Sequence, residues 1–261
     1  MGLQVLSIPE FYTQLSAAQE RLDPAWEVET WQEQIIEERA LLAKALGEPA
    51  GRRVLDCSCG SGGQAIPLAQ LGWQVTATDI TPASLTQAIE HARALNLDIA
   101  FQACDMSELG QHFQHEFDCV LSCMAIDQIL DDDALVAALR GMWQALKDGG
   151  VCYLRVRDFD HILAVQPHYE VKEVRMTPAG QVLRLEDWVF ESEEHLICIW
   201  ILLQKKPSYW KTQAFAWRRR ALRKLELEQR LVAAGFSDVT FLPQLSPWHP
   251  YELLACRPVL A

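Results

Sequence analysis

Hydrophobic residues follow two different periods along this chain. Up to Pro49, apolar residues such as Trp31, Ile35 and Leu42 recur at roughly helical spacing, which predicts helices. From residue 53 onward, short apolar runs alternate with helical stretches. The expected strands are 53–57, 74–78, 99–103, 117–122 and 151–156, and the expected helices are 64–71, 82–95 and 133–146. Such alternation predicts an α/β fold, a Rossmann-like doubly wound sheet with helices on both faces.

The pattern changes after residue 165. The β-rich runs 171–176, 182–190 and 196–203 are joined by short turns, which cannot make parallel crossovers, so antiparallel hairpins are expected. Residues 212–217 are a candidate further strand, and a helix over 222–234 precedes strands at 237–242 and 252–256. The expected division is a helical lid (1–49), an α/β core (50–165), an antiparallel β insertion acting as a cap (166–217) and a C-terminal segment completing the core (218–261).

Composition and charge narrow the classes of function. The 261 residues are 50% hydrophobic, which suits one α/β domain with an insertion. With 23 basic and 35 acidic residues the net charge is −12, so a nucleic-acid partner is not expected. The run 196–203 is far shorter than the ~20 apolar residues of a membrane span. No secretory signal begins the sequence and the cysteines lie in apolar stretches, so a cytoplasmic protein without a metal site is expected.

The segment Val54-Leu55-Asp56-Cys57-Ser58-Cys59-Gly60-Ser61-Gly62-Gly63 carries the clearest chemical signal. Gly60 and Gly62 let the backbone approach a ligand, and the following helix offers unpaired N–H groups. Gly60-x-Gly62-x-x-Ala65 also fits a dinucleotide-binding loop, so an NAD-dependent oxidoreductase stays open. Asp56 at the strand end would repel a pyrophosphate and attract a cationic amine. Asp79, which ends the next strand, suits a ribose diol in either class.

Four segments together resemble the class I S-adenosylmethionine (SAM)-dependent methyltransferases. They are the Asp56-x-x-x-Gly60-x-Gly62 loop, Asp79 after the second strand, Cys104-Asp105-Met106 after the third, and Leu146-Lys147-Asp148-Gly149-Gly150 before the fifth. The resemblance covers residues 54–156. It implies the seven-stranded sheet of that class, SAM as the cofactor and S-adenosylhomocysteine (SAH) as the product.

The resemblance also implies a cofactor site. The glycine loop would pass under the methionine part of SAM with Asp56 near the amino group. Asp79 would accept hydrogen bonds from the ribose hydroxyls, and Asp105 would meet the adenine amino group. The full set of expected cofactor-binding residues is Asp56, Ser58, Gly60, Gly62, Asp79, Ile80, Asp105, Met106 and Cys123.

Within that class, Arg157-Asp158-Phe159-Asp160 and the Trp188-bearing insertion are similar to the glycine N-methyltransferases, whose Arg-Asn-Tyr-Asp segment departs at two positions here. The similarity implies that Arg157 binds a substrate carboxylate. A salt bridge with Asp158, Asp160 or Asp187 is the alternative role. The expected substrate-binding residues are Arg157, Tyr12, Trp31 and Met124, and the candidates for positioning the substrate are Tyr12, Asp127 and Gln128. No catalytic residue is assigned. The basic run 217–220 is expected to be a solvated face, and the alternative is that Arg218 or Arg220 points from a strand into the cap and binds an anionic substrate.

The chemistry of the acceptor depends on whether a base is present. A neutral amine needs no strong base before it attacks the methyl group, whereas a hydroxyl does. The nearby imidazoles are His161 and His168, so a small-molecule N-methyltransferase is expected, and an O-methyltransferase becomes competitive if either ring points inward. A non-catalytic SAM-binding regulator is the third alternative. Exposed hairpin edges such as 196–203 could pair subunits in a homodimer.

Overall fold

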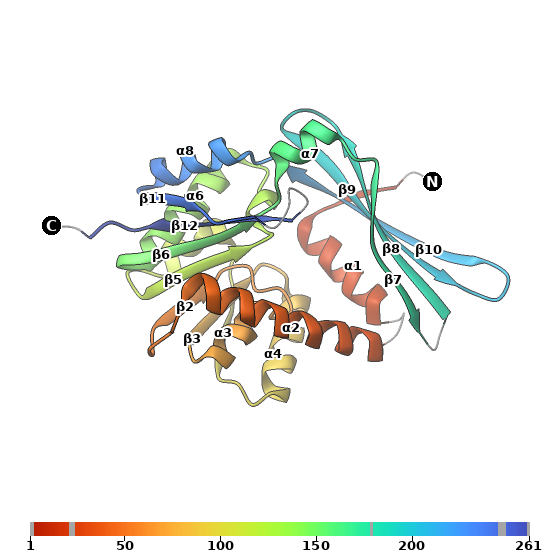
Figure 1. The fold of residues 1–261 in the computed structure, drawn as a ribbon, viewed down its shortest axis with the longest axis horizontal. Coiled ribbons are helices and arrows are strands. Elements are labelled where there is room, and N and C mark those ends of the chain that lie inside the picture. Colours follow the sequence, from red (N-terminus) through yellow and green to blue (C-terminus); the bar gives the residue numbers. More distant parts are fainter. Residues whose placement is uncertain (1–2, 21–23, 178–179, 245–248, 260–261) are drawn as a thin grey trace.

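The computed structural model describes residues 3–20, 24–177, 180–244 and 249–259, which build two separate β-sheets and their helices (Figure 1). The larger sheet has seven strands in the order β11-β12-β6-β5-β2-β3-β4. Their bounds are β2 Arg53–Asp56, β3 Gln74–Asp79, β4 Ile99–Ala103, β5 Phe117–Cys123, β6 Leu146–Val156, β11 Ser237–Phe241 and β12 Tyr251–Cys256. β2 to β6 run parallel, and β12 is antiparallel to both neighbours. The predicted Rossmann-like fold is confirmed.

Helices cover both faces of this sheet (Figure 1). One side carries α2 (Pro24–Leu46), α3 (Ala65–Leu71) and α4 (Pro82–Ala94), and the other carries α5 (Leu109–His112), α6 (Asp132–Ala145) and α8 (Lys224–Ala234). The central strands are buried from both sides, and Leu55 and Val120 are fully covered. β6 begins at Leu146, directly after α6, so that helix ends one residue earlier than the sequence pattern predicted. Similarly, α8 begins two residues later than predicted.

The strand order places a crevice at the centre of the sheet. β2 lies between β3 and β5, so the connections that leave β2 and β5 at their carboxyl ends run to opposite faces. In open α/β sheets, ligands bind outside the carboxyl ends of the strands at such a point. The glycine loop follows β2, and the segment around Met124 follows β5, so both lie at this crevice.

The cap is a second, five-stranded sheet in the order β1-β10-β9-β8-β7. Its strands are β1 Val5–Leu6, β7 Tyr169–Thr177, β8 Gly180–Phe190, β9 His195–Lys205 and β10 Trp210–Arg220, with α7 (Phe159–Val165) before them. β7 to β10 form antiparallel hairpins, and the candidate strand 212–217 is part of β10. The cap sheet therefore runs three residues beyond the expected boundary and also takes a parallel strand, β1, from the expected lid.

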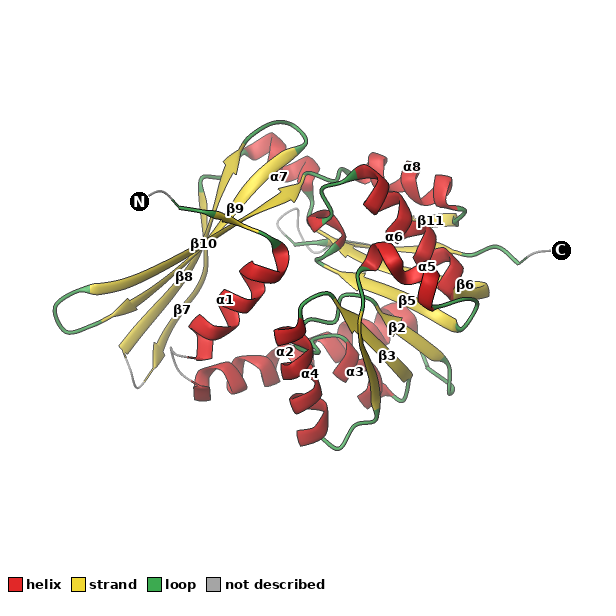
Figure 2. Cartoon of the chain, turned by 180° about the vertical axis from the view of Figure 1, so that it is seen from behind, coloured by secondary structure: helices red, strands yellow, loops and turns green. Residues whose placement is uncertain are grey.

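Helix α1 (Ile8–Glu20) joins the cap to the core (Figure 2). It contacts β10 of the cap and both α2 and α4 of the core. Phe11 is buried and its ring stacks on Trp217 with 3.9 Å between ring centroids. Because α1 is held on both sides, it forms a wall of the space between the two sheets. Within the described residues, none of the helices has the length and apolar character needed to cross a membrane.

Candidate active site

A cavity of about 710 Å³ lies between the carboxyl ends of the core strands, helix α1 and the inner face of the cap sheet. The core contributes the glycine loop and the residues that follow β3, β4 and β5. The volume is within the range of ~300–1,000 Å³ that is usual for ligand sites. Ten of the residues proposed from sequence line it: Tyr12, Ser58, Gly60, Asp79, Ile80, Asp105, Met106, Cys123, Met124 and Gln128.

The glycine loop is tied to the end of β3 by Asp79. Gly60 N donates to Asp79 Oδ2 at 2.9 Å, and Thr81 N donates to Asp79 Oδ1 at 2.8 Å. Gly60 has φ +53° and Gly62 has φ +98°, a left-handed conformation that favours glycine. A Cβ on Gly62 would lie 2.8 Å from Ile66 Cδ1, and Gly62 does not line the cavity. Gly62 therefore shapes the loop, whereas Gly60 faces the cavity beside Asp79.

Asp56 lies beneath the loop and not in the cavity wall. Its side chain is fully buried, and Oδ1 accepts a hydrogen bond from Ser58 N at 3.2 Å. Oδ2 has no hydrogen-bond partner within the described part of the chain. Burial, together with the charge of the nearby Asp79, raises the pKa of Asp56 to about 7. The structure thus places Asp56 where it supports the loop from below, without direct access to a ligand.

The floor of the cavity is formed by residues after β4 and β5. Ser58 Oγ lies 3.0 Å from Ser122 Oγ and accepts from Cys123 N at 3.3 Å, so the glycine loop and the end of β5 are joined. Asp105 Oδ1 accepts from both the backbone N and the Oγ of Ser107 at 2.8 Å, which fixes the start of the short helix η1 (Met106–Glu108). Asp105 and Met106 are thereby held facing the cavity.

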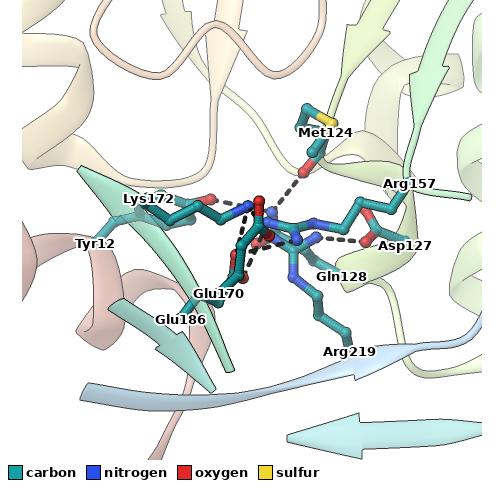
Figure 3. Close-up of polar contacts among 9 residues, drawn as sticks. All are labelled: Tyr12, Met124, Asp127, Gln128, Arg157, Glu170, Lys172, Glu186 and Arg219. Atoms are coloured by element: carbon teal, nitrogen blue, oxygen red, sulfur yellow. Dashed lines mark hydrogen bonds and ion pairs between the residues drawn. The ribbon is translucent and has the colours of Figure 1, made fainter. Parts of the chain in front are cut away.

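A polar chain connects α1 to the floor (Figure 3). Gln128, on the short helix η2 (Ile126–Gln128), donates from Nε2 to Tyr12 Oη at 3.0 Å and to Met124 O at 2.8 Å. Burial raises the pKa of Tyr12, so its phenol stays neutral near pH 7. Tyr12 therefore presents a hydroxyl group to the cavity, held in place by Gln128.

Two of the predicted substrate or positioning residues lie behind the cavity in buried ion pairs (Figure 3). Arg157 binds Glu186 through two nitrogens at 3.0 and 3.1 Å, so its partner is none of the three aspartates considered from sequence. Asp127 pairs with Arg219. Arg219 is only 3% exposed, which contradicts the solvated face expected for 217–220. Side chains alternate between the faces of a strand, and β10 directs Trp217 and Arg219 inward.

Trp31 also lies away from the cavity lining. Its indole packs against His91 of α4, with ring centroids 4.0 Å apart, so it contacts the core helices. His161 and His168 do not line the cavity, and His168 is exposed.

Sequence reasoning missed the contributions of the lid and the cap to the cavity. Ile8 and Leu15 of α1, Gln34 of α2, and Arg184 and Trp200 of the cap strands all line it. These residues carry no local motif. Arg184 and Trp200 are 16 positions apart in sequence and come together because their strands, β8 and β9, pair in the cap sheet. Period-two alternation along β8 and β9 was the available signal, because it separates inward from outward residues.

Comparison with known proteins agrees with this geometry. Residues 54–150 match a family described as "Methyltransferase domain". A ubiquinone biosynthesis O-methyltransferase from Xanthomonas axonopodis pv. citri (strain 306) is 32% identical over 107 residues, which cover 41% of this chain and 44% of the relative. A glycine/sarcosine N-methyltransferase from Aphanothece halophytica is 27% identical over 139 residues, 52% of each chain. The chain thus spans about half the length of these relatives.

The likeness in three dimensions extends over the whole chain. A sugar N-methyltransferase from Streptoalloteichus sp ATCC 53650 superposes with a TM-score of 0.71 and 17% identity, covering 99% of this chain and 97% of that one. At this identity the match concerns the fold, including the cap sheet. The strand order and the glycine loop agree with the match of residues 54–150 to a methyltransferase domain, and the fold is that of the class I SAM-dependent methyltransferases. SAM is the cofactor of this class.

Proposed function

We propose that the protein is a SAM-dependent enzyme that transfers a methyl group to the nitrogen of a small-molecule amine. The observation that carries the proposal is the position of Asp79, which holds the glycine loop through Gly60 N and lines a cavity that continues to Tyr12. The cavity therefore joins a nucleoside-binding wall to an enclosed space for a second molecule.

The residues of the cavity suit SAM. Asp79 and Asp105 are hydrogen-bond acceptors for the ribose hydroxyls and the adenine amino group, and Ile80 and Met106 are apolar partners for the ring. When bound, SAM supplies an activated methyl group on a sulfonium. Gly60 and Ser58 then lie on the loop side, and Cys123 and Met124 lie between the cofactor part and the acceptor part.

An amine acceptor is favoured because the three carboxylates that line the cavity, Asp79, Asp105 and Asp131, are each held by backbone N–H groups. No histidine lines the cavity among the residues that the structure describes, and Tyr12 is neutral near pH 7. An amine loses its first proton to water and needs only to be held, and Tyr12 Oη can accept a hydrogen bond from its N–H. Positioning alone can supply ~7–11 kcal/mol of the barrier when the reacting atoms are held ~3–3.5 Å apart.

O-methylation is the second candidate, because the relative from Xanthomonas carries an O-methyltransferase name and matches the core. The two candidates separate in one assay: a panel of acceptors in matched pairs, each an amine and the corresponding alcohol or phenol, is incubated with SAM, and methylated products are weighed by mass spectrometry. Products from amines alone support the proposal. Products from hydroxyl compounds alone would contradict it, and SAM binding without any product would favour a non-catalytic regulator.

Tyr12→Phe is expected to lower kcat/KM for the amine acceptor by ~10-fold, the equivalent of one hydrogen bond of about 1.4 kcal/mol. Gln128 would lose one of its two hydrogen-bond acceptors and keep Met124 O, and the apolar packing of the ring against Phe11 would persist. The SAH affinity, measured by calorimetry, should stay within twofold. A large loss of SAH affinity in Tyr12→Phe would place this residue in the cofactor site and contradict the assignment.

A further inference from the structure

One positive side chain faces the proposed acceptor space. Among the described residues that line the cavity, Arg184 of β8 is the single Lys or Arg. Of the three acids in the lining, Asp79 and Asp105 belong to the cofactor side, and Asp131 accepts a hydrogen bond from Ala134 N at the start of α6. The guanidinium of Arg184 lies 5.1 Å from the ring centre of Trp200, which also lines the cavity. A cation and an apolar ring therefore stand together on the cap wall, opposite the glycine loop.

Three largely buried arginines, Arg157 after β6 and Arg184 and Arg219 of the cap, differ in how their charge is balanced. Arg157 has two contacts to Glu186 at 3.0 and 3.1 Å, and Arg219 is paired with Asp127. The partner of Arg184 is Glu173, at 3.8 Å, and Glu173 is closer to Arg175, at 3.0 Å. Arg157 and Arg219 are therefore closely neutralised, whereas Arg184 shares a more distant acid with another cation.

The surroundings of Arg184 also suit an anionic ligand. Its side chain is 18% exposed, and its Nε has no hydrogen-bond partner within the described ranges. Burial lowers the pKa of Arg184, and Glu173 and Glu186 offset that effect only in part. An oxyanion in the cavity would meet the planar fork of donors that guanidinium offers to carboxylate and phosphate groups.

We infer that the methyl acceptor carries a carboxylate or phosphate group, bound by Arg184, with its apolar part against Trp200 and Tyr12. This inference rests on the proposed function. It moves anion recognition from Arg157, whose charge is already matched by Glu186, to a cap residue that faces the cavity. The methionine carboxylate of SAM is the competing source of an anion, and its binding would instead make Arg184 part of the cofactor site.

The test uses benzoate, phenyl phosphate and neutral benzamide as probes, titrated into the full chain with and without SAH and followed by tryptophan fluorescence. We expect an anionic probe to bind at least tenfold more tightly than benzamide, and Arg184→Gln to abolish that preference. Arg184→Lys should keep part of it. Arg218→Gln is the matched control, because Arg218 is a cap arginine that pairs with Glu191 and does not line the cavity, so this variant should keep the preference. Whichever of benzoate and phenyl phosphate binds more tightly identifies the anionic group of the acceptor as a carboxylate or a phosphate.

Calorimetric titration with SAH distinguishes a failure of the inference about Arg184 from a failure of the proposed function. If Arg184→Gln binds SAH normally yet keeps the preference for the anionic probes, or if the unmodified protein shows no preference or binds no probe, the inference is overturned. A loss of SAH affinity in Arg184→Gln without a change in probe preference would assign Arg184 to the cofactor carboxylate and overturn it too. Absence of SAH binding to the unmodified protein would refute the proposed function, while the titrations without SAH would still measure the role of Arg184.

Discussion

Replacing Asp79 with asparagine is expected to raise the Kd for SAM and SAH by ~100-fold, because hydrogen bonds to a charged group contribute about 1.5–3 kcal/mol each. Asp79 lines the cavity and also accepts the backbone N–H groups of Gly60 and Thr81. The amide would turn one accepting oxygen into a donor, which would face either a backbone N–H or a ribose hydroxyl. Isothermal titration calorimetry measures the change directly.

Asp98→Asn is the matched control, since Asp98 is exposed and lies between α4 and β4, outside the cavity lining. Its affinity for SAH should equal that of the unmodified protein. Circular dichroism of both variants separates lost affinity from lost folding. A Kd for Asp79→Asn within twofold of the unmodified value would show that Asp79 serves only to hold the loop.

Glu186→Ala is expected to lower the free energy of unfolding by about 3–5 kcal/mol, the cost of leaving a buried charge without its partner. Glu186 is completely buried between Arg157 and Lys172, whose Nζ lies 3.3 Å from Glu186 Oε2 (Figure 3). Removing the carboxylate leaves Arg157 uncompensated at the junction of the core and the cap. Urea unfolding followed by tryptophan fluorescence gives the change.

The pH dependence of the free energy of unfolding gives a second measure of the contribution of Glu186. Burial alone would raise the pKa of Glu186, but Arg157 and Lys172 outweigh it and lower the pKa to about 2. The folded state thus holds the ionised form more strongly than the unfolded state does. The stabilisation is fully present above the ordinary glutamate pKa of about 4.3 and is lost as the pH falls toward 2. The difference between the unmodified protein and Glu186→Gln should shrink over that range.

Glu191→Ala is the control for Glu186, because Glu191 pairs with Arg218 in a partly exposed ion pair at 2.6 Å. Exposed pairs of this kind contribute about 0–1 kcal/mol. Equal effects of Glu186→Ala and Glu191→Ala would contradict the account of the buried pair.

The core could be predicted from sequence because its signals are local. Each strand of the parallel sheet is a short apolar run, and Asp79 and Asp105 stand at strand ends, where the fold gathers side chains at one edge. The cap could be predicted only as hairpins. Which face of the hairpins points inward depends on how the cap sheet packs against α1 and the core, so Arg184 and Trp200 could not be placed and Arg219 was assigned to solvent. The long-range contacts of α1 with β10 were likewise invisible in its periodicity.

The motif around Arg157 could not show which acid neutralises its charge. Its neighbours in sequence, Asp158 and Asp160, are acids, yet Asp158 caps α7 and binds Lys224 at 2.7 Å. The actual partner, Glu186, comes from β8 and is brought close only by the packing of the cap. The sequence therefore suggested acidic partners of the right chemistry, and one of them, Asp187, is the neighbour of the actual partner on β8.

Calorimetric titration of the unmodified protein with SAM, SAH and NAD tests the central claim most directly. The account predicts one binding site per chain for SAM and for SAH, and no heat of binding with NAD. Binding of NAD, or failure to bind either sulfur nucleoside, would contradict the claim and leave the glycine loop as a feature of the fold alone.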